Sequence, residues 1–236
     1  MDTSLLLALT MIFIGSFVQS SIGFGLAIIT APILFQISPD YVPAPITLTA
    51  LFLSLVNAYK FKANISLDGL WMAFIGRIPG SIAGGALLYF VEPKVLSLWI
   101  GGIVILAVII SLLPIRIQPN STRLAIAGFF SGLFGTSSGI GGPPMALLLQ
   151  HQEANLIRAN LSAFFVVSSL LSLIVQVPVG HMSLHHLYLS LPFIPASYLG
   201  YKCAMVYVDK IDKQTIRTIS LVMCSLSGAV AIYSAL

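Results

Sequence analysis

Two glycine-rich segments interrupt long apolar stretches of the chain, and both carry hydroxyl side chains beside their glycines. Gly23 and Gly25 mark the first segment, and Gly139, Gly141 and Gly142 mark the second. Free backbone N–H groups at the start of a helix bind anions, and glycine lets a ligand approach them closely. The pattern therefore predicts an anion site, or alternatively only tight helix packing through small residues. The predicted site residues in these two segments are Gln19, Ser20, Ser21, Gly23, Phe24, Gly25, Thr136, Ser137, Ser138, Gly139, Gly141, Gly142 and Pro143.

Arg77 is the basic residue that lies in the middle of an apolar segment. In a membrane-spanning helix such a charge costs about 2.5–3.5 kcal/mol on insertion scales. No carboxylate lies inside another apolar segment to neutralise it, and Asp68 and Glu92 lie at the ends of its own segment. We therefore expect Arg77 to contact an anionic substrate. The alternatives are hydrogen bonds to backbone carbonyls of a broken helix, or a side chain that extends outward to the membrane interface.

The composition indicates that these residues lie in a membrane protein. Of 236 residues 58% are hydrophobic and 8% are charged, and the mean hydropathy is +1.01, whereas a soluble domain carries roughly 25% charged residues. The net charge of +4 comes from basic residues between apolar stretches, which is typical of membrane orientation signals and not of nucleic-acid binding. Cys203 and Cys224 lie inside apolar stretches without the spacing of metal ligands, so we expect neither a metal site nor a cofactor.

Eight apolar stretches predict an all-α polytopic membrane protein. Two of them, 4–36 and 122–150, contain the glycine segments and are too long for one straight crossing of about 20 residues. We expect each to form two half-length helices around a break, either as a re-entrant hairpin or as a discontinuous helix. The other six have the length of ordinary crossings and lie near 42–60, 67–91, 95–114, 156–179, 184–207 and 215–236.

The two halves of the chain resemble each other, which predicts one repeat over residues 1–117 and a second over 118–236 within a single membrane domain. At an offset of 116 or 117, Gly23 and Gly25 coincide with Gly139 and Gly141, and further matches follow in the same order. If the glycine segments are re-entrant, nine basic residues face one side of the membrane and only Lys94 the other. The positive-inside rule then favours two inverted repeats of three crossings each, with both termini outside.

The glycine segments also resemble the duplicated signature of the TauE/SafE family. The resemblance rests on residues 14–25 with 31–32, on 128–135 with 139–144, and on Arg77 with Pro79 and the glycines that follow it. It implies a permease of the bacterial inner membrane for sulfur-containing anions such as sulfite or sulfoacetate, usually in the direction of export. The two half-sites differ, because Leu26 stands where the second segment has Gly142 and only the second has a double proline.

Two other functions compete with this interpretation. The segment Gly135-Thr136-Ser137-Ser138-Gly139 fits the G-x-S-x-G pattern, which predicts an intramembrane serine hydrolase with Ser137 or Ser138 as nucleophile, although no strand and no histidine at matching depth accompany it. The third function is a membrane subunit without transport of its own. Since the chain has no nucleotide-binding motif, transport would draw on an ion gradient, with a proton or a sodium ion as the coupling ion, or on a partner. A homodimer is compatible with the sequence.

Overall fold

The computed structural model describes residues 3–66, 70–112, 118–150, 152–207 and 213–234, and the regular structure of these residues is entirely helical. The helices are α1 (Thr3–Ile22), α2 (Leu26–Ile37), η1 (Pro39–Tyr41), α3 (Ala44–Lys60), η2 (Lys62–Asn64), α4 (Trp71–Phe90), α5 (Pro93–Leu112), α6 (Ser121–Ser138), α7 (Gly142–Leu149), α8 (Ala154–Val179), α9 (Leu184–Ser190), α10 (Phe193–Tyr207) and α11 (Lys213–Tyr233).

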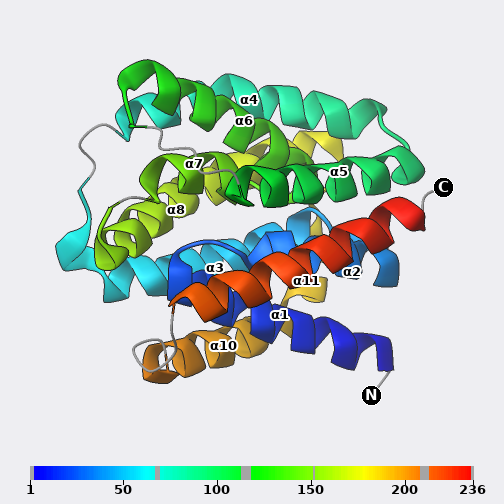
Figure 1. Cartoon of the computed structure of the whole chain (residues 1–236). Coiled ribbons are helices and arrows are strands. Elements are labelled where there is room, and N and C mark those ends of the chain that lie inside the picture. The colour runs from blue at the N-terminus through cyan, green and yellow to red at the C-terminus, as the bar shows by residue number, and fades with distance from the viewer. Residues whose placement is uncertain (1–2, 67–69, 113–117, 151, 208–212, 235–236) are drawn as a thin grey trace.

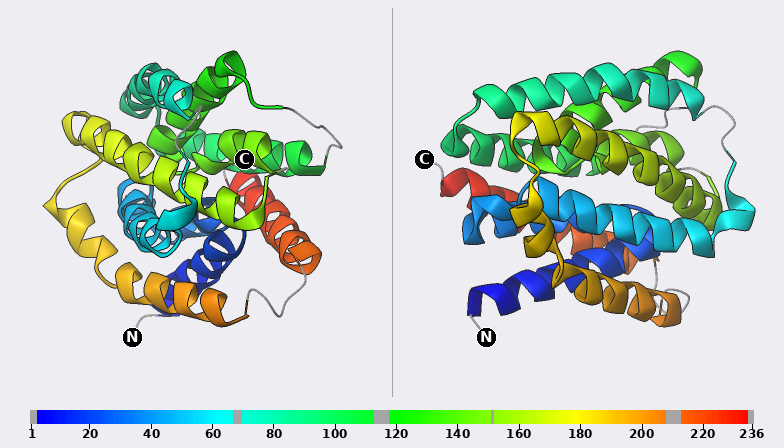
Figure 2. Two further views of the ribbon diagram at one scale, coloured as in Figure 1. Left: turned by 90° about the vertical axis from the view of Figure 1, so that its left-hand side faces the viewer. Right: turned by 180° about the vertical axis from the view of Figure 1, so that it is seen from behind.

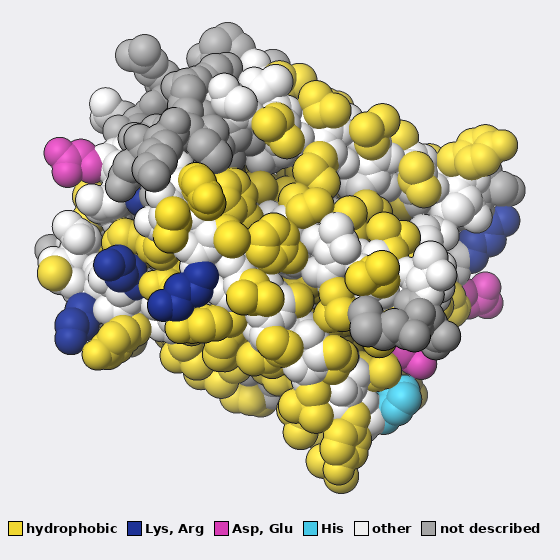
Figure 3. Space-filling view, turned by 90° about the horizontal axis from the view of Figure 1, so that it is seen from below, with side chains coloured by type: hydrophobic (Ala, Val, Ile, Leu, Met, Phe, Trp, Pro, Cys, Tyr) yellow, Lys and Arg dark blue, Asp and Glu magenta, His cyan; other side chains and the backbone are white. Residues whose placement is uncertain are grey.

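The helices form one bundle, and their axes run roughly along its length in both directions. Both termini lie at the right-hand end of the bundle in Figure 1, and α4, α6, α8 and α11 begin at the opposite end. The reverse view in Figure 2 agrees. Apolar side chains cover most of the face in Figure 3, and lysine and arginine side chains gather at its left-hand end. The chain thus exposes an apolar belt to its surroundings, as lipid contact requires.

Five helical segments among the described residues are long and apolar enough to cross a membrane: Thr3–Ile22, Pro39–Lys60, Trp71–Phe90, Pro93–Leu112 and Ala154–Val179. Four of them correspond to predicted elements, but α1 has 20 residues where a half-length helix was expected. The expected crossing at 184–207 is divided into α9 and α10, because Pro192 lacks an N–H group and interrupts the helix. The described apolar part of the last crossing is Thr218–Tyr233.

Both glycine segments interrupt the helices at the predicted positions, and at both the chain turns back on itself. A Cβ atom at Gly15 in α1 would lie 3.1 Å from the Cα of Leu26 and 2.8 Å from Cγ2 of Thr30 in α2. In the second segment, the site of a Cβ at Gly135 lies 3.2 Å from the Cα of Gly141. The helices of each pair are unequal, with 20 and 12 residues in the first and 18 and 8 in the second.

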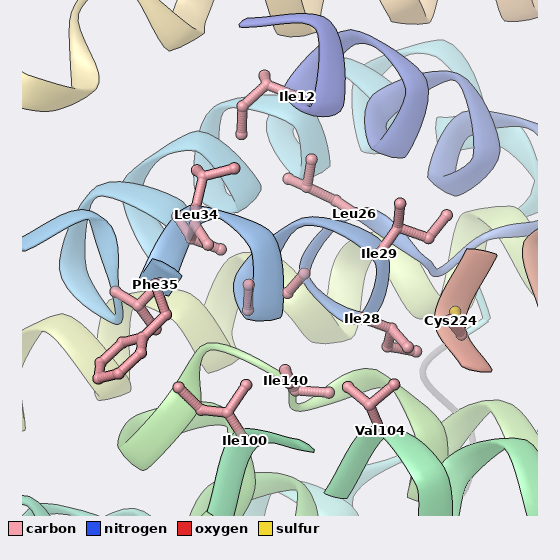
Figure 4. Close-up of a cluster of buried hydrophobic side chains, with 14 of the residues drawn as sticks. Ile12, Leu26, Ile28, Ile29, Leu34, Phe35, Ile100, Val104, Ile140 and Cys224 are labelled. Atoms are coloured by element: carbon pink, nitrogen blue, oxygen red, sulfur yellow. The ribbon is translucent and has the colours of Figure 1, made fainter. Parts of the chain in front are cut away.

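Helix α2 forms the centre of the larger apolar core. Its sequence is apolar on every side, so it has no face suited to water, and nine of its twelve residues are buried. Ile28, Ile29 and Leu34 belong to the same cluster of buried side chains as Ile100 and Val104 of α5, and Figure 4 shows this cluster. The apolar core therefore holds the first break in place from its C-terminal side.

Helices α4 and α6 contact each other through their backbones. A Cβ atom at Gly76 or Gly80 would overlap the carbonyl groups of Ala125 or Phe129, so only glycine fits there. Helices α1 and α10 form a similar contact, in which a Cβ at Gly200 would overlap the carbonyl oxygen of Phe13. Close backbone approach through small residues is the usual way in which membrane helices associate. The packing explanation of the glycines is thus correct for these two helix pairs.

We expect Gly80→Ala to destabilise the fold, because the new methyl group must separate α4 from α6. Overpacking of this kind lowers the free energy of unfolding by about 1–3 kcal/mol. Gly102→Ala is the matched control, since no atom lies within 4 Å of a Cβ at that position, and alanine is favoured over glycine in a helix. Thermal denaturation in detergent compares the two proteins. Equal stability of Gly80→Ala and the wild type would contradict the observed helix contact.

Candidate anion site

A cavity of about 40 Å³ lies between the two breaks. This volume corresponds to about three water-sized groups. Both breaks contribute to its wall, and α3, α4 and α8 complete it. The lining residues are Gln19, Phe24, Gly25, Ala27, Ile28, Thr47, Ala50, Arg77, Gly135, Gly139, Ile140, Gly141, Gly142, Phe165, Ser168, Ser169 and Ser172.

The first break depends on backbone conformations that favour glycine. Gly23 has a φ of 96° and Gly25 a φ of 135°, and both lie in the region that side chains with a Cβ rarely adopt. The Oε1 atom of Gln19 accepts a hydrogen bond of 3.3 Å from the backbone N–H of Leu26. Gln19 therefore connects the end of α1 to the start of α2 and fixes the reversal.

The second break follows the same plan with different partners. Gly139 ends α6 with a φ of 80°, and the hydroxyl of Ser138 accepts a 3.3 Å hydrogen bond from the N–H of Ile140. The hydroxyl of Ser131, two helix turns earlier, donates to the carbonyl of Gly141 at 2.5 Å. Helix α7 then begins with prolines at its first positions, where the missing N–H groups would have no partner in any case.

Arg77 projects from α4 into the space between α6 and α8. Its side chain is 2% exposed, so the interpretation in which it extends outward to the interface is wrong. Nη1 donates to the hydroxyl of Ser131 at 2.8 Å. Nη2 donates to the hydroxyl of Ser172 at 2.8 Å and to the carbonyl of Ser168 at 3.0 Å. The guanidinium group is thus fixed beside the second break.

The charge of Arg77 has no anionic partner in the part of the chain that the structure describes, where the one ion pair joins His185 to Asp40. Its Nε atom has no hydrogen-bond partner there either. Arginine stays protonated in proteins, and its five N–H groups minus the three hydrogen bonds above leave two. The Phe164 ring, 5.7 Å away, gives only weak compensation. The site therefore carries one positive charge and unused donors.

Half of the predicted site residues line the cavity: Gln19, Phe24, Gly25, Arg77, Gly139, Gly141 and Gly142. The other half lie outside it: Ser20, Ser21, Gly23, Thr136, Ser137, Ser138 and Pro143. Three of these serine hydroxyls donate to a carbonyl four residues earlier in their own helix. Ser20 instead accepts from Asn57, and Thr136 pairs with Ser172. Their hydroxyl groups are thus engaged within the protein.

Ten lining residues were not predicted, and the largest group of them, four residues, comes from α8. Ser168 and Ser172 contact Arg77, Ser169 lines the cavity beside them, and Gln176 donates to the carbonyl of Thr136 at 2.9 Å. Positions 168, 172 and 176 are four residues apart, so they lie on one face of the helix. This stripe of polar residues in an apolar helix is the signal that could have identified them.

The geometry does not favour the hydrolase interpretation. Ser137 donates its hydroxyl to the carbonyl of Leu133 at 2.6 Å and accepts from Nε1 of Trp99 at 3.0 Å. Ser138 donates to the carbonyl of Phe134 at 2.7 Å. A nucleophilic serine needs a base within hydrogen-bond reach, and among the described residues neither hydroxyl contacts a histidine or a carboxylate.

The apolar helices and the polar interior site define an integral, multi-pass α-helical membrane protein. Residues 7–231 match the family model described as Sulfite exporter TauE/SafE, and the chain therefore belongs to this family. The membership confirms the resemblance found in the sequence, and it indicates a membrane transporter of sulfite or related anions. No curated protein and no solved structure matches the chain.

The two break glycines 23 and 141 should respond differently to substitution by alanine. A Cβ at Gly141 would lie 3.2 Å from Nη1 of Arg77 and 3.0 Å from the carbonyl oxygen of Ser131, inside the cavity. We expect Gly141→Ala to weaken sulfite binding by roughly tenfold, the value of about one hydrogen bond. Gly23 does not line the cavity but has a positive φ, so Gly23→Ala should lower stability by about 1–2 kcal/mol and leave affinity unchanged.

Calorimetric titration with sulfite and thermal denaturation of the same purified proteins separate these two effects. If Gly23→Ala loses affinity while Gly141→Ala binds normally, the assignment of the anion site to this cavity is wrong.

Proposed function

We propose that the protein is a secondary transporter that holds a small sulfur-containing anion, such as sulfite or sulfoacetate, at Arg77 between the two helix breaks. One observation carries this proposal, namely a fully buried arginine without a carboxylate partner in the described residues, facing a cavity. A buried charge is stable only when it is paired and hydrogen-bonded. A bound anion would supply the missing pair.

The cavity suits a small and fully desolvated anion. Its remaining wall consists of apolar side chains, serine hydroxyls and the backbone of Gly139, Gly141 and Gly142. In such surroundings of low dielectric, the attraction between the guanidinium and an oxyanion is much stronger than in water. The volume of about 40 Å³ suits an anion with a few heavy atoms better than a long-chain sulfonate.

The internal contacts support two inverted repeats, 1–117 and 118–236, as the basis of transport. Gly84 of α4 approaches the carbonyl oxygen of Leu133 and Cβ of Thr136 in α6, and its counterpart Gly200 of α10 approaches α1 in the same way. Helix α4 of the first repeat thus packs against α6, the first helix of the second, and α10 of the second repeat packs against α1, the first helix of the first. Such exchange is expected of two halves related by a pseudo-two-fold axis, the recurring architecture of secondary transporters.

Export is the direction that we propose, because the matched family is described as an exporter. The basic end of the bundle in Figure 3 supports a cytoplasmic position for that end and an outer position for both termini, in a bacterial inner membrane. In this orientation each break returns the chain to the side from which it came. A coupling proton or sodium ion and a homodimer remain expectations from the sequence.

The central test replaces Arg77. We expect Arg77→Gln to weaken sulfite binding about 10- to 100-fold, because a hydrogen bond to a charged group contributes about 1.5–3 kcal/mol. Arg77→Lys should restore binding only in part, since an ammonium keeps the charge but loses the planar arrangement that reaches Ser131 and Ser172 together. Calorimetry with sulfite measures the affinities, and thermal denaturation of the same proteins measures stability.

Arg123→Gln is the matched control, because Arg123 is an exposed arginine at the start of α6 that donates to the carbonyl of Gln118. It should bind sulfite like the wild type. An Arg77→Gln protein that is destabilised but binds sulfite with unchanged affinity would assign Arg77 a purely structural role and remove it from the site.

The proposed orientation is tested with single cysteines at Ser4 and Gln118, both exposed, in a protein that carries Cys203→Ser and Cys224→Ser. A membrane-impermeant thiol reagent should label Ser4→Cys from outside and Gln118→Cys from inside, since nine basic residues face the inner side in this orientation. Intact cells and inverted vesicles provide the two sides. Labelling of both positions from the same side would rule out re-entrant breaks and the inverted repeat.

A further inference from the structure

A second and larger cavity lies next to the anion site. Its volume is about 260 Å³, and it shares Phe24, Gly25 and Ile28 with the cavity at Arg77. Its other walls include Ser111 in the last turn of α5 and Gln150 and Ala154 between α7 and α8. The C-terminal end of α5 and the connection from α7 to α8 lie at the bundle end opposite both termini (Figure 2). We call this cavity the vestibule.

The vestibule has a basic side chain in its wall. Arg158 of α8 lines it, is 6% exposed, and donates from Nε to the carbonyl of Ser21 at 2.8 Å. This hydrogen bond connects α8 to the end of α1, next to the first break.

Phe24 separates the vestibule from the anion site. It lines both cavities, and it packs against both apolar cores of the protein. Its Cβ lies 3.4 Å from the position of a Cβ at Gly142, which brings the two breaks into contact at this point. Gly23 and Gly25 on either side of it both have positive φ, so this ring sits on a short loop between two glycine hinges.

Ile140 is the counterpart of Phe24 in the second break. It lies 116 residues later, between Gly139 and Gly141, and also lines the anion site. In contrast to Phe24 it is fully buried and does not line the vestibule. Figure 4 shows Ile140 between Ile28 of α2 and the α5 side chains Ile100 and Val104. The anion site is therefore bounded by one apolar side chain from each break.

We propose that Phe24 and Ile140 are the two gates of the transport path, and that the structure is the state in which the vestibule leads up to Phe24 while Ile140 is sealed by α2 and α5. This proposal rests on the proposed transport function. An apolar constriction blocks a hydrated anion because the anion would lose its water without compensation. Outward opening then requires Ile140 to leave its pocket while Phe24 stays in place, and inward opening requires only a displacement of the Phe24 ring.

The test measures access to the anion site from each side of the membrane. Ser169, which lines the anion site but not the vestibule, is replaced by cysteine in the protein carrying Cys203→Ser and Cys224→Ser. The second of these changes is essential, because Cys224 itself lines the vestibule. Sulfonatoethyl methanethiosulfonate, a small anionic and membrane-impermeant reagent, is applied to right-side-out and to inverted vesicles, and the labelling rate is followed.

Phe24→Ala should raise the labelling rate from the vestibule side, and Ile140→Ala the rate from the opposite side. Because an open minor state is typically populated at about 0.1–10%, removal of a gate should accelerate labelling about tenfold or more. Phe24→Trp should slow labelling from the vestibule side, a change in the opposite direction that unfolding cannot imitate. Phe90→Ala and Ile82→Ala, at positions 80% and 61% exposed, should leave both rates unchanged.

The proposal is overturned if Phe24→Ala leaves the rate from the vestibule side unchanged, or if either variant accelerates labelling equally from both sides. Should Phe24→Ala fail to fold, Phe24→Leu replaces it and must label faster than Phe24→Trp. Sulfite binding to the unlabelled protein is measured separately by calorimetry. Absence of sulfite binding with side-specific gating intact would contradict the proposed substrate and not the gates.

Discussion

The structure depends on Arg77, a buried positive charge without an anionic partner in the part of the chain that the structure describes. Three hydrogen bonds hold the Arg77 guanidinium, yet none of their acceptors carries a charge. The neighbouring helices leave space for the guanidinium group of Arg77 at this position. Gly135 and Gly141 leave room for its Nη atoms, since a Cβ at Gly135 would lie 2.8 Å from Nη2. Backbone contact between α4 and α6 brings the arginine close enough to reach across to α8.

The proposed internal repeat does not duplicate this charge. The counterpart of Arg77 in the second repeat lies at Phe193, which is fully buried in the larger apolar core and packs edge-on against Tyr41 at 5.1 Å between ring centroids. The helix contacts of the two repeats are similar, but the chemistry of the two halves is different. A scaffold of two such repeats with Arg77 in only one of them would hold the proposed anion off its pseudo-symmetry axis, nearer to the second break. This asymmetry agrees with the departures of the first glycine segment, where Leu26 replaces a glycine.

The features that could be predicted from the sequence are those encoded by single residues. Gly23, Gly25 and Gly139 adopt positive φ angles and mark the breaks, and Arg77, which lies in the middle of an apolar segment, is buried. Helix lengths were less accessible, because nothing in α1 limits it to half a crossing. The expectation of a single crossing at 184–207 did not take Pro192 into account, although its ring ends α9.

Two of the missed site residues, Ser168 and Ser172, lie on α8, about 30 residues beyond the second break, and only tertiary packing brings them to Arg77. The serines next to the break glycines were better candidates because they lie closer to the break in the sequence. A helix turns by about 100° per residue, however, so neighbouring residues point in different directions. Ser137 and Ser138 therefore point away from the cavity and bond their own helix carbonyls, the usual behaviour of serine in an apolar helix. Ser168 and Ser172 instead face a cation that can use their oxygens as acceptors. The partner of a buried charge thus depends on which helix faces that charge in the fold. The hydroxyl groups that serve an anion site in a membrane should therefore be sought on the helix face opposite the arginine.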